Sequence, residues 1–323
     1  MNKNYSVGAI VACIISALSC QIQAESKNGF SLDGALIPVD EIHFGGPPKD
    51  GIPALDNPEF VPAGRANFLQ PNDRVLALRR NGVAKAYPLR ILNWHEIVND
   101  RFGDEAITIV YCPLCGSGTA SRAKIGDQLL TFGVSGLLYN SDVLMYDRQT
   151  QSLWSQIQAQ AVTGPMKGAR LTGVSVIHTT WKDWFFRHPD TLVLSLETGY
   201  QRNYDANPYQ GYDQDNSIMF PVRFRSEGYH PKEPVLGLVL DGSAKAYPFI
   251  ELEKTVSETS NDAPVEIADE LAGYSIRVRY DATHRSVEVF DEKGEAIPGV
   301  TLFWFAWYAF HPETAVYRFE KSN

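Results

Sequence analysis

The residues best suited to chemistry are two cysteines in the run Cys112-Pro113-Leu114-Cys115-Gly116. The Cys-x-x-Cys spacing is typical of three kinds of site: a redox-active dithiol, half of a metal site, or a haem attachment site. Haem attachment needs His directly after the second cysteine, and this chain has Gly116 there. A redox pair and a metal site therefore remain.

The residues that follow the second cysteine help to separate these two. A thioredoxin-type pair lies at the N-terminus of a helix, whose end lowers the pKa of the first thiol. Gly116-Ser117-Gly118-Thr119 is a poor start for a helix. Cys-Pro-x-Cys-Gly instead resembles the knuckle of rubredoxins and zinc ribbons, in which Pro stiffens the turn and Gly allows a positive φ. The second knuckle that completes those sites is absent from the sequence.

Two thiolates need further ligands from elsewhere in the chain. His95 is the nearest candidate, because it lies on the apolar face of a helix expected over residues 88–100, and the thioether of Met145 is a second. Thiolates with imidazole or thioether form a soft donor set that favours copper(I). The sequence thus predicts copper bound by Cys112, Cys115, His95 and Met145, with zinc or no metal as the alternatives.

A polar segment over residues 132–148 is the other feature with chemical potential. Its simpler interpretation is a β-hairpin with an Asn-Ser-Asp turn and an Asp-Arg pair on the surface. Its functional interpretation is a polar rim around the cysteine site. The candidate rim residues are Tyr139, Asn140, Asp142, Asp147, Arg148 and Trp154.

Each candidate ligand also has a purely structural interpretation. The cysteines could form a short disulfide or pack as small hydrophobic residues. His95 could be a core histidine bonded to a backbone carbonyl, and Met145 could fill a gap in the core. These alternatives stay open at this point.

The N-terminus indicates export. Lys3 precedes a short apolar run over residues 7–18, and Ile22-Gln23-Ala24 offers a cleavage site. Removing 24 residues takes away Cys13 and Cys20 and leaves two cysteines in about 299 residues (323 minus 24), which is no disulfide scaffold. We expect a periplasmic or secreted protein without a transmembrane anchor, with lipid attachment at Cys20 as the alternative.

The formal charge constrains the partners. The net charge of −9, without any run of Lys and Arg, argues against nucleic acid as a partner. A metal ion, a small molecule or another periplasmic protein remains.

The chain contains an internal similarity. The string VLAL recurs as VLGL and the string AKAYP recurs unchanged, both at a constant offset of 160. In each copy the two strings flank a turn, Asn81-Gly82 or Asp241-Gly242, that predicts a β-hairpin. The two copies also end alike, with His188 matched by His311 at an offset of 123. Features present in both copies are expected to serve the fold. The cysteines and His95 belong to the first copy alone, since the second copy has no cysteine and has Thr255 at the position that corresponds to His95.

These patterns predict an α+β, β-rich fold made of two tandem repeats of a β-hairpin, helix and sheet unit, of which only the first carries the Cys-x-x-Cys site. The predicted parts are a signal peptide over 1–24, an extended N-terminal arm over 25–70, the first repeat over 71–197, a polar linker loop over 198–231, and a second, degenerate repeat over 232–323.

Several long strings resemble one known family. LRILNWHEIVND, VYCPLCGSG, LTFGVSGLLYNSDVLMYDRQTQSLWSQ and HPDTLVLS are similar to the exported bacterial proteins grouped as domain of unknown function 3179. The resemblance covers most of the mature chain and implies no activity, but it supports a site in the first copy. The residues that match the family pattern are His95, Cys112, Cys115, Tyr139, Asn140, Asp142, Met145, Asp147, Arg148 and Trp154.

Three functions follow from these observations. The first is an extracytoplasmic metal-binding protein that handles copper or acts as a redox metalloprotein. The second is a periplasmic thiol-disulfide oxidoreductase, in which Cys112 attacks and Cys115 resolves. The third is a non-catalytic binding module with a structural disulfide.

Overall fold

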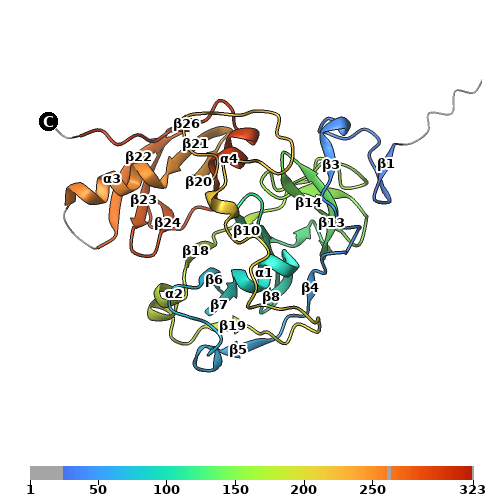
Figure 1. Ribbon diagram of the computed structural model, residues 1–323, viewed down its shortest axis with the longest axis horizontal. Coiled ribbons are helices and arrows are strands. Elements are labelled where there is room, and N and C mark those ends of the chain that lie inside the picture. The colour runs from blue at the N-terminus through green and yellow to red at the C-terminus, as the bar shows by residue number, and fades with distance from the viewer. Residues whose placement is uncertain (1–24, 260–262, 322–323) are drawn as a thin grey trace, which may run out of the picture.

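The computed structural model describes residues 25–259 and 263–321 (Figure 1). This part of the chain is rich in β-strands, which confirms the α+β, β-rich fold class. The expected signal peptide, with Cys13 and Cys20, lies outside the described residues. The helices of the described part are α1 Leu89–His95, α2 Trp181–Arg187, α3 Phe249–Thr259 and α4 Trp304–Phe310.

The first predicted hairpin forms the centre of a five-stranded sheet. Asn81 and Gly82 both have positive φ, which matches the twist of a two-residue hairpin turn. The order of the strands is β18-β6-β7-β19-β5. Their bounds are β5 Phe60–Pro62, β6 Arg74–Arg80, β7 Val83–Pro88, β18 Ile177–Thr180 and β19 Leu192–Leu194.

The largest sheet joins the two halves of the chain. Its order is β26-β21-β20-β25-β10-β9-β8-β4, with β17 also paired to β10. Strand β10 of the first half pairs with β25 of the second half at Gly118 and Thr301. The halves therefore share one continuous sheet. The bounds are β4 Leu55–Asp56, β8 Ile97–Phe102, β9 Glu105–Cys112, β10 Ser117–Arg122, β17 Gly173–Val174, β20 Pro234–Leu240, β21 Ser243–Pro248, β25 Val300–Phe303 and β26 Ala315–Val316.

The two similar segments pair their strands in the same way. The order β18-β6-β7-β19 corresponds to β25-β20-β21-β26, and in both the outer pairings are antiparallel at one side and parallel at the other. Buried polar contacts correspond as well: Lys85 and Tyr87 bind Asp100, and their counterparts bind a single aspartate, Asp269. Their origin by duplication and the proposed domain boundaries stay predictions.

A second five-stranded sheet carries the polar segment over residues 132–148. Its order is β16-β15-β14-β13-β3, and β13 and β14 form the expected hairpin. The bounds are β3 Ile42–Phe44, β13 Phe132–Tyr139, β14 Asp142–Asp147, β15 Leu153–Ser155 and β16 Gln160–Ala161. A three-stranded sheet of β22 Val265–Leu271, β23 Tyr274–Asp281 and β24 Ser286–Asp291 packs with α3 in the second half (Figure 1).

The N-terminal arm and the linker both lie against the rest of the molecule. The arm adds one short strand to each of three sheets, through β3, β4 and β5. The remaining elements of the arm are β1 Ser26–Lys27, β2 Phe30–Ser31, η1 Val39–Glu41 and η2 Ala63–Arg65. A separate two-stranded hairpin of the first half consists of β11 Lys124–Ile125 and β12 Gln128–Leu129. The linker over 198–231 has no strand and one 3-10 helix, η3 Tyr212–Gln214.

The helix expected over residues 88–100 is shorter than predicted. It ends at His95 because Glu96 takes φ +56° and ψ −39°, which no helix residue adopts. The next residues form β8, whose backbone pairs with β9. Tertiary pairing thus overrides the helical spacing of the apolar residues. Within the described residues, no helix is long and apolar enough to cross a membrane.

Candidate metal centre

The two cysteines lie at the end of a β-hairpin formed by β9 and β10. Cys112 is the last residue of β9 and pairs with Ser117, the first residue of β10. The amide of Cys115 donates to the carbonyl of Cys112 over 3.2 Å, and Gly116 has φ +61°. The turn is therefore a knuckle of the expected kind, and a strand follows it where a thioredoxin-type site would have a helix.

A second hairpin turn faces this knuckle. Asn140 and Ser141 connect β13 to β14, and both have positive φ. The carbonyl oxygen of Ser141 lies 3.9 Å from the sulfur of Cys112 and 3.3 Å from that of Cys115, and it accepts from both thiols. The Ser141 hydroxyl is buried and has no hydrogen-bond partner in the described part of the chain. The two turns thus contact each other through buried polar groups.

Asp142, the first residue of β14, lies close to both cysteines. One oxygen of its carboxylate and the two sulfur atoms all lie within 4.8 Å of one another, and all three residues are buried. The carboxylate accepts from the amide of Ile157 over 3.3 Å and lies 3.5 Å from the hydroxyl of Ser117. Two sulfurs and one carboxylate oxygen at this separation are compatible with ligation of a single metal ion.

A second buried carboxylate, that of Glu96, lies close to the group. Burial, and after it the charge of Asp142, together raise the pKa of Glu96 to about 8. Burial also raises the pKa of Asp142 to about 7, against the opposing effect of its hydrogen bonds. Neither carboxylate forms an ion pair with a basic side chain of the described residues. The site therefore concentrates acidic groups that a cation would stabilise.

The two thiols, like the two carboxylates, are buried groups whose pKa values are raised. Burial raises the pKa of both Cys112 and Cys115, and the nearby carboxylate of Asp142 acts in the same direction. Neither cysteine is in a disulfide. A reactive catalytic thiol needs a lowered pKa and some exposure. These thiols have neither, so the geometry disfavours nucleophilic attack by Cys112.

The second half of the chain holds the knuckle in place. The amide of Phe303 in β25 donates to the carbonyl of Cys115 over 2.8 Å, and the Phe303 ring covers Gly116. The facing turn is fixed in a similar way, because the Asn140 amide group donates to the carbonyl of Ala309 in α4. The cysteine site therefore depends on contacts that only the complete chain supplies.

The linker covers the site from another side. Tyr209 and Tyr212 pack against the hydrophobic core that contains both cysteines. The amide of Arg223 donates to the side chain of Asn140 over 2.8 Å. A segment interpreted from sequence as a polar connection thus contributes aromatic side chains to the wall of the site.

His95 is placed differently from the predicted ligand. Its Nδ1 lies 2.8 Å from the carbonyl oxygen of Pro53, and its Nε2 lies 2.7 Å from the hydroxyl of Tyr204. Both ring nitrogens are therefore engaged, and His95 is outside the group formed by Cys112, Cys115 and Asp142. The arrangement matches the alternative interpretation of a hydrogen-bonded core histidine.

Met145 is buried in the same hydrophobic core as the two cysteines, and Trp154 belongs to that core as well. Across the sheet Met145 pairs with Val134 and Trp154. Its part in metal binding stays a prediction.

The predicted rim residues separate into two groups along the β13–β14 hairpin. Tyr139, Asn140 and Asp142 lie at the turn that faces the cysteines. Asp147 lies five residues further along β14, about 17 Å away at the usual rise of a strand. It is buried and accepts from the indole of Trp154, so it is no surface charge. Arg148 contacts Asp50 and Asp56 of the N-terminal arm.

Sequence reasoning missed Glu96, although the signal was present. At the offset of 160 that relates the two halves, His95 corresponds to Thr255 and Glu96 corresponds to Val256. An acidic residue present in only one half therefore stood next to the residue that was selected. The positive φ of Glu96 directs the chain from α1 into β8, and such strained backbone is often found at functional sites.

A second group of metal-ligating side chains lies elsewhere, at Asp183, Asp281 and His284. Hydrogen bonds within the protein already engage it: Asp183 binds Arg187 over 2.6 Å, and the His284 ring binds Thr180 over 2.7 Å. This group is therefore stabilised without a metal ion.

Comparison with known proteins places the chain in a family. A family model described as a protein of unknown function (DUF3179) matches residues 49–314. The chain belongs to this family. The match spans both halves and the cysteine site, and it confirms the resemblance that the sequence motifs indicated. Neither the curated proteins nor the solved structures contain a match. Because the DUF3179 description names no activity, the function must be argued from the site.

Proposed function

We propose that this protein binds one metal ion outside the cytoplasm, through the sulfurs of Cys112 and Cys115 and the carboxylate of Asp142. The observation that carries the proposal is that these two sulfurs and one oxygen of this carboxylate lie within 4.8 Å of one another, in three buried residues. The export signal expected over residues 1–24 supports the location.

The donor set favours zinc over the copper(I) expected from sequence. Copper(I) was favoured by soft imidazole or thioether ligands, whereas a carboxylate oxygen is a hard ligand. Two thiolates and one carboxylate carry a formal charge of about −3, with Glu96 beside them, so a divalent ion compensates the buried charge better than a monovalent one. Zinc accepts sulfur and carboxylate oxygen in one tetrahedral site.

Copper is the second candidate because Met145 is buried in the same core as both cysteines. A shift of this side chain towards the thiolates would restore a softer set. The two metals make different demands on Asp142, since copper(I) needs no carboxylate.

Glu96 has a different role in this proposal. It lies near the ligands but outside the group of mutually close atoms. We assign it the role of a neighbouring carboxylate whose charge would favour a bound cation. Its removal should therefore weaken binding less than the removal of Asp142.

The experiment measures metal content in mature protein purified without a metal-affinity tag under reducing conditions. We expect close to one equivalent of zinc, which the Cys112→Ser and Cys115→Ser variants lose. Asp142→Asn should weaken zinc binding at least tenfold and Glu96→Gln by less. Asp147→Asn is the matched control, because it changes another buried aspartate of the same strand and should leave the stoichiometry unchanged.

Unchanged zinc stoichiometry in the double Cys112→Ser/Cys115→Ser variant would overturn the proposal. One equivalent of copper that depends on both cysteines but is insensitive to Asp142→Asn would replace zinc by copper.

A further inference from the structure

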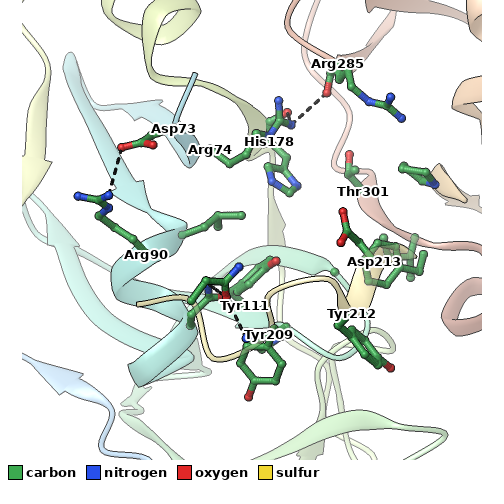
Figure 2. Close-up of a pocket in the computed structure, with 18 of the residues that line it drawn as sticks. Asp73, Arg74, Arg90, Tyr111, His178, Tyr209, Tyr212, Asp213, Arg285 and Thr301 are labelled. Carbon is green, nitrogen blue, oxygen red and sulfur yellow. Dashed lines mark hydrogen bonds and ion pairs between the residues drawn. The ribbon is translucent and has the colours of Figure 1, made fainter. Parts of the chain in front are cut away.

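A cavity of about 500 Å³ lies between the two halves of the molecule, next to the cysteine knuckle. Tyr111, Pro113 and Gly116 of the knuckle line one side of it. Figure 2 shows Arg74 and His178 on the opposite side from Tyr111 and Tyr209. Its volume is within the range of roughly 300–1,000 Å³ that is usual for small-molecule sites.

The lining comes from corresponding positions of the two halves. Offsets of 160 and 123 relate Arg74 to Pro234 and His178 to Thr301, and all four residues line the cavity. The strand registers agree with these offsets, because His178 pairs with Leu76 while Thr301 pairs with Leu236. Only the first half therefore has an arginine and a histidine at these positions. Because the second half forms the same strand pairing without them, the shared fold does not require these two side chains, and we expect them to serve binding.

Arg74 supplies a positive charge without a carboxylate partner. Within the described residues, its guanidinium donates only to backbone carbonyls, those of His178, His284 and Arg285. These three bonds leave two of its five N–H groups available. Burial lowers the pKa of Arg74 to about 10, but the group stays charged at neutral pH. A largely buried cation at the wall of a cavity, without an ion-pair partner among the described residues, favours an anionic ligand.

His178 lies beside Arg74, which binds its backbone carbonyl, but the ring nitrogens of His178 have no hydrogen-bond partner among the described residues. Both ring nitrogens are shielded from solvent. Burial, together with the charge of Arg74, lowers its pKa well below the usual range, so the ring is neutral. Buried polar atoms without partners are rare in proteins, and a neutral imidazole offers one N–H donor to a ligand.

The other arginines of the lining pair with carboxylates, whereas none of the lining carboxylates pairs with Arg74. Arg90 lies 3.9 Å from Asp73 and 3.5 Å from Asp205, and Arg285 lies 3.6 Å from Glu253. Asp213 lines the cavity on the side of Tyr212 and Thr301 (Figure 2). The apolar part of the lining consists of Leu89, Pro113, Pro234, Phe249, Leu302 and Phe303.

We propose that this cavity binds a small organic monocarboxylate, with its carboxylate beside Arg74 and His178 and its apolar body against the side chains of both halves. The site is separate from the three metal ligands and does not rest on the metal proposal. Arginine N–H groups suit a carboxylate, and the mixed lining suits an organic acid better than an inorganic anion.

The test uses three probes of similar shape, namely benzoate, benzamide and benzylammonium, in calorimetric titrations of the mature protein at low ionic strength. Benzoate should bind at least tenfold more tightly than either of the others. Arg74→Gln and His178→Phe should each weaken benzoate binding at least tenfold. Arg79→Gln is the control, because it removes an exposed arginine from the same strand and should change nothing.

Arg74 also bonds three carbonyls, so its variant can lose stability. The His178→Phe variant and the preference of the wild type for benzoate then decide the question. Equal affinity for benzoate and benzamide, or full benzoate affinity in His178→Phe, would overturn the proposal. The Cys112→Ser/Cys115→Ser variant should retain benzoate binding; loss there would instead place the carboxylate on a metal ion.

Discussion

At the scale of single residues, the site depends on which buried side chains are satisfied by hydrogen bonds and which carry an acidic group without a basic partner among the described residues. His95 and Asp142 were both candidates from the sequence, and the structure places them in opposite situations. His95 has a partner for each ring nitrogen, whereas Asp142 faces two thiols and another carboxylate. A buried group that is already satisfied contributes to stability, while an uncompensated acidic group favours a cation.

The first prediction concerns His95. His95→Ala removes two buried hydrogen bonds, so the free energy of unfolding should fall by about 1–3 kcal/mol. Metal content should stay at the wild-type value. Denaturant titration and elemental analysis of the same samples check both statements. Tyr204→Phe is the matched control, since it removes the hydrogen bond to Nε2 from the other side. Loss of the metal with unchanged stability would restore His95 as a ligand.

The second prediction concerns pH and the metal-free protein. The folded-state pKa values of Glu96 and Asp142 are raised to about 8 and about 7, so the folded state holds protons that the unfolded state releases. Their contribution to stability is complete below about pH 4 and is lost as pH rises through these folded-state values. Urea unfolding should therefore show stability falling between pH 5 and pH 8 after chelation.

Two variants isolate this effect from other titrating groups. Glu96→Gln should flatten the fall, whereas Asp127→Asn, which changes an exposed carboxylate, should leave it unchanged. A stability that rises between pH 5 and pH 8 in the metal-free wild type would contradict the charge distribution of the site.

At the scale of elements, the knuckle and the facing hairpin turn determine the geometry. Both were recognisable in the sequence, because Cys-Pro-x-Cys-Gly and Asn-Ser-Asp are turn signals that act locally. Their juxtaposition was not recognisable, since it depends on the packing of β10 and β14 in different sheets. The early end of α1 was missed for the same reason: pairing of β8 with β9 decided it, and apolar spacing alone favoured a longer helix.

The third prediction tests the knuckle. Gly116→Ala places a side chain at φ +61°, and its Cβ would approach the Phe303 ring to 3.0 Å. We expect a loss of about 1–2 kcal/mol from the backbone alone, with an additional loss from the contact and weaker metal binding. Gly126→Ala is the matched control, because Gly126 also has positive φ but nothing within 4 Å of the added carbon. Equal effects of the two variants on stability and metal content would contradict the role given to Phe303.

At the scale of the whole molecule, the first half carries the proposed metal ligands and the second half contacts the turns that hold them. The sequence predicted the β-rich class and located the cysteine site in the first half, because internal similarity and local motifs are visible along the chain. It could not predict that the halves share a sheet, or that residues 198–231 cover the site with aromatic side chains. Those features arise from contacts between residues far apart in the chain, such as Arg223 with Asn140 and Phe303 with Cys115.

In the proposed site, two sulfurs and the carboxylate of Asp142 bind the metal. X-ray absorption spectroscopy of the protein loaded with one equivalent of zinc measures these ligands directly. We expect about two sulfur scatterers near 2.3 Å and oxygen scatterers at about 2.0–2.2 Å, without the outer-shell scattering of an imidazole ring. A first shell without sulfur, or a clear imidazole contribution, would contradict the proposed site.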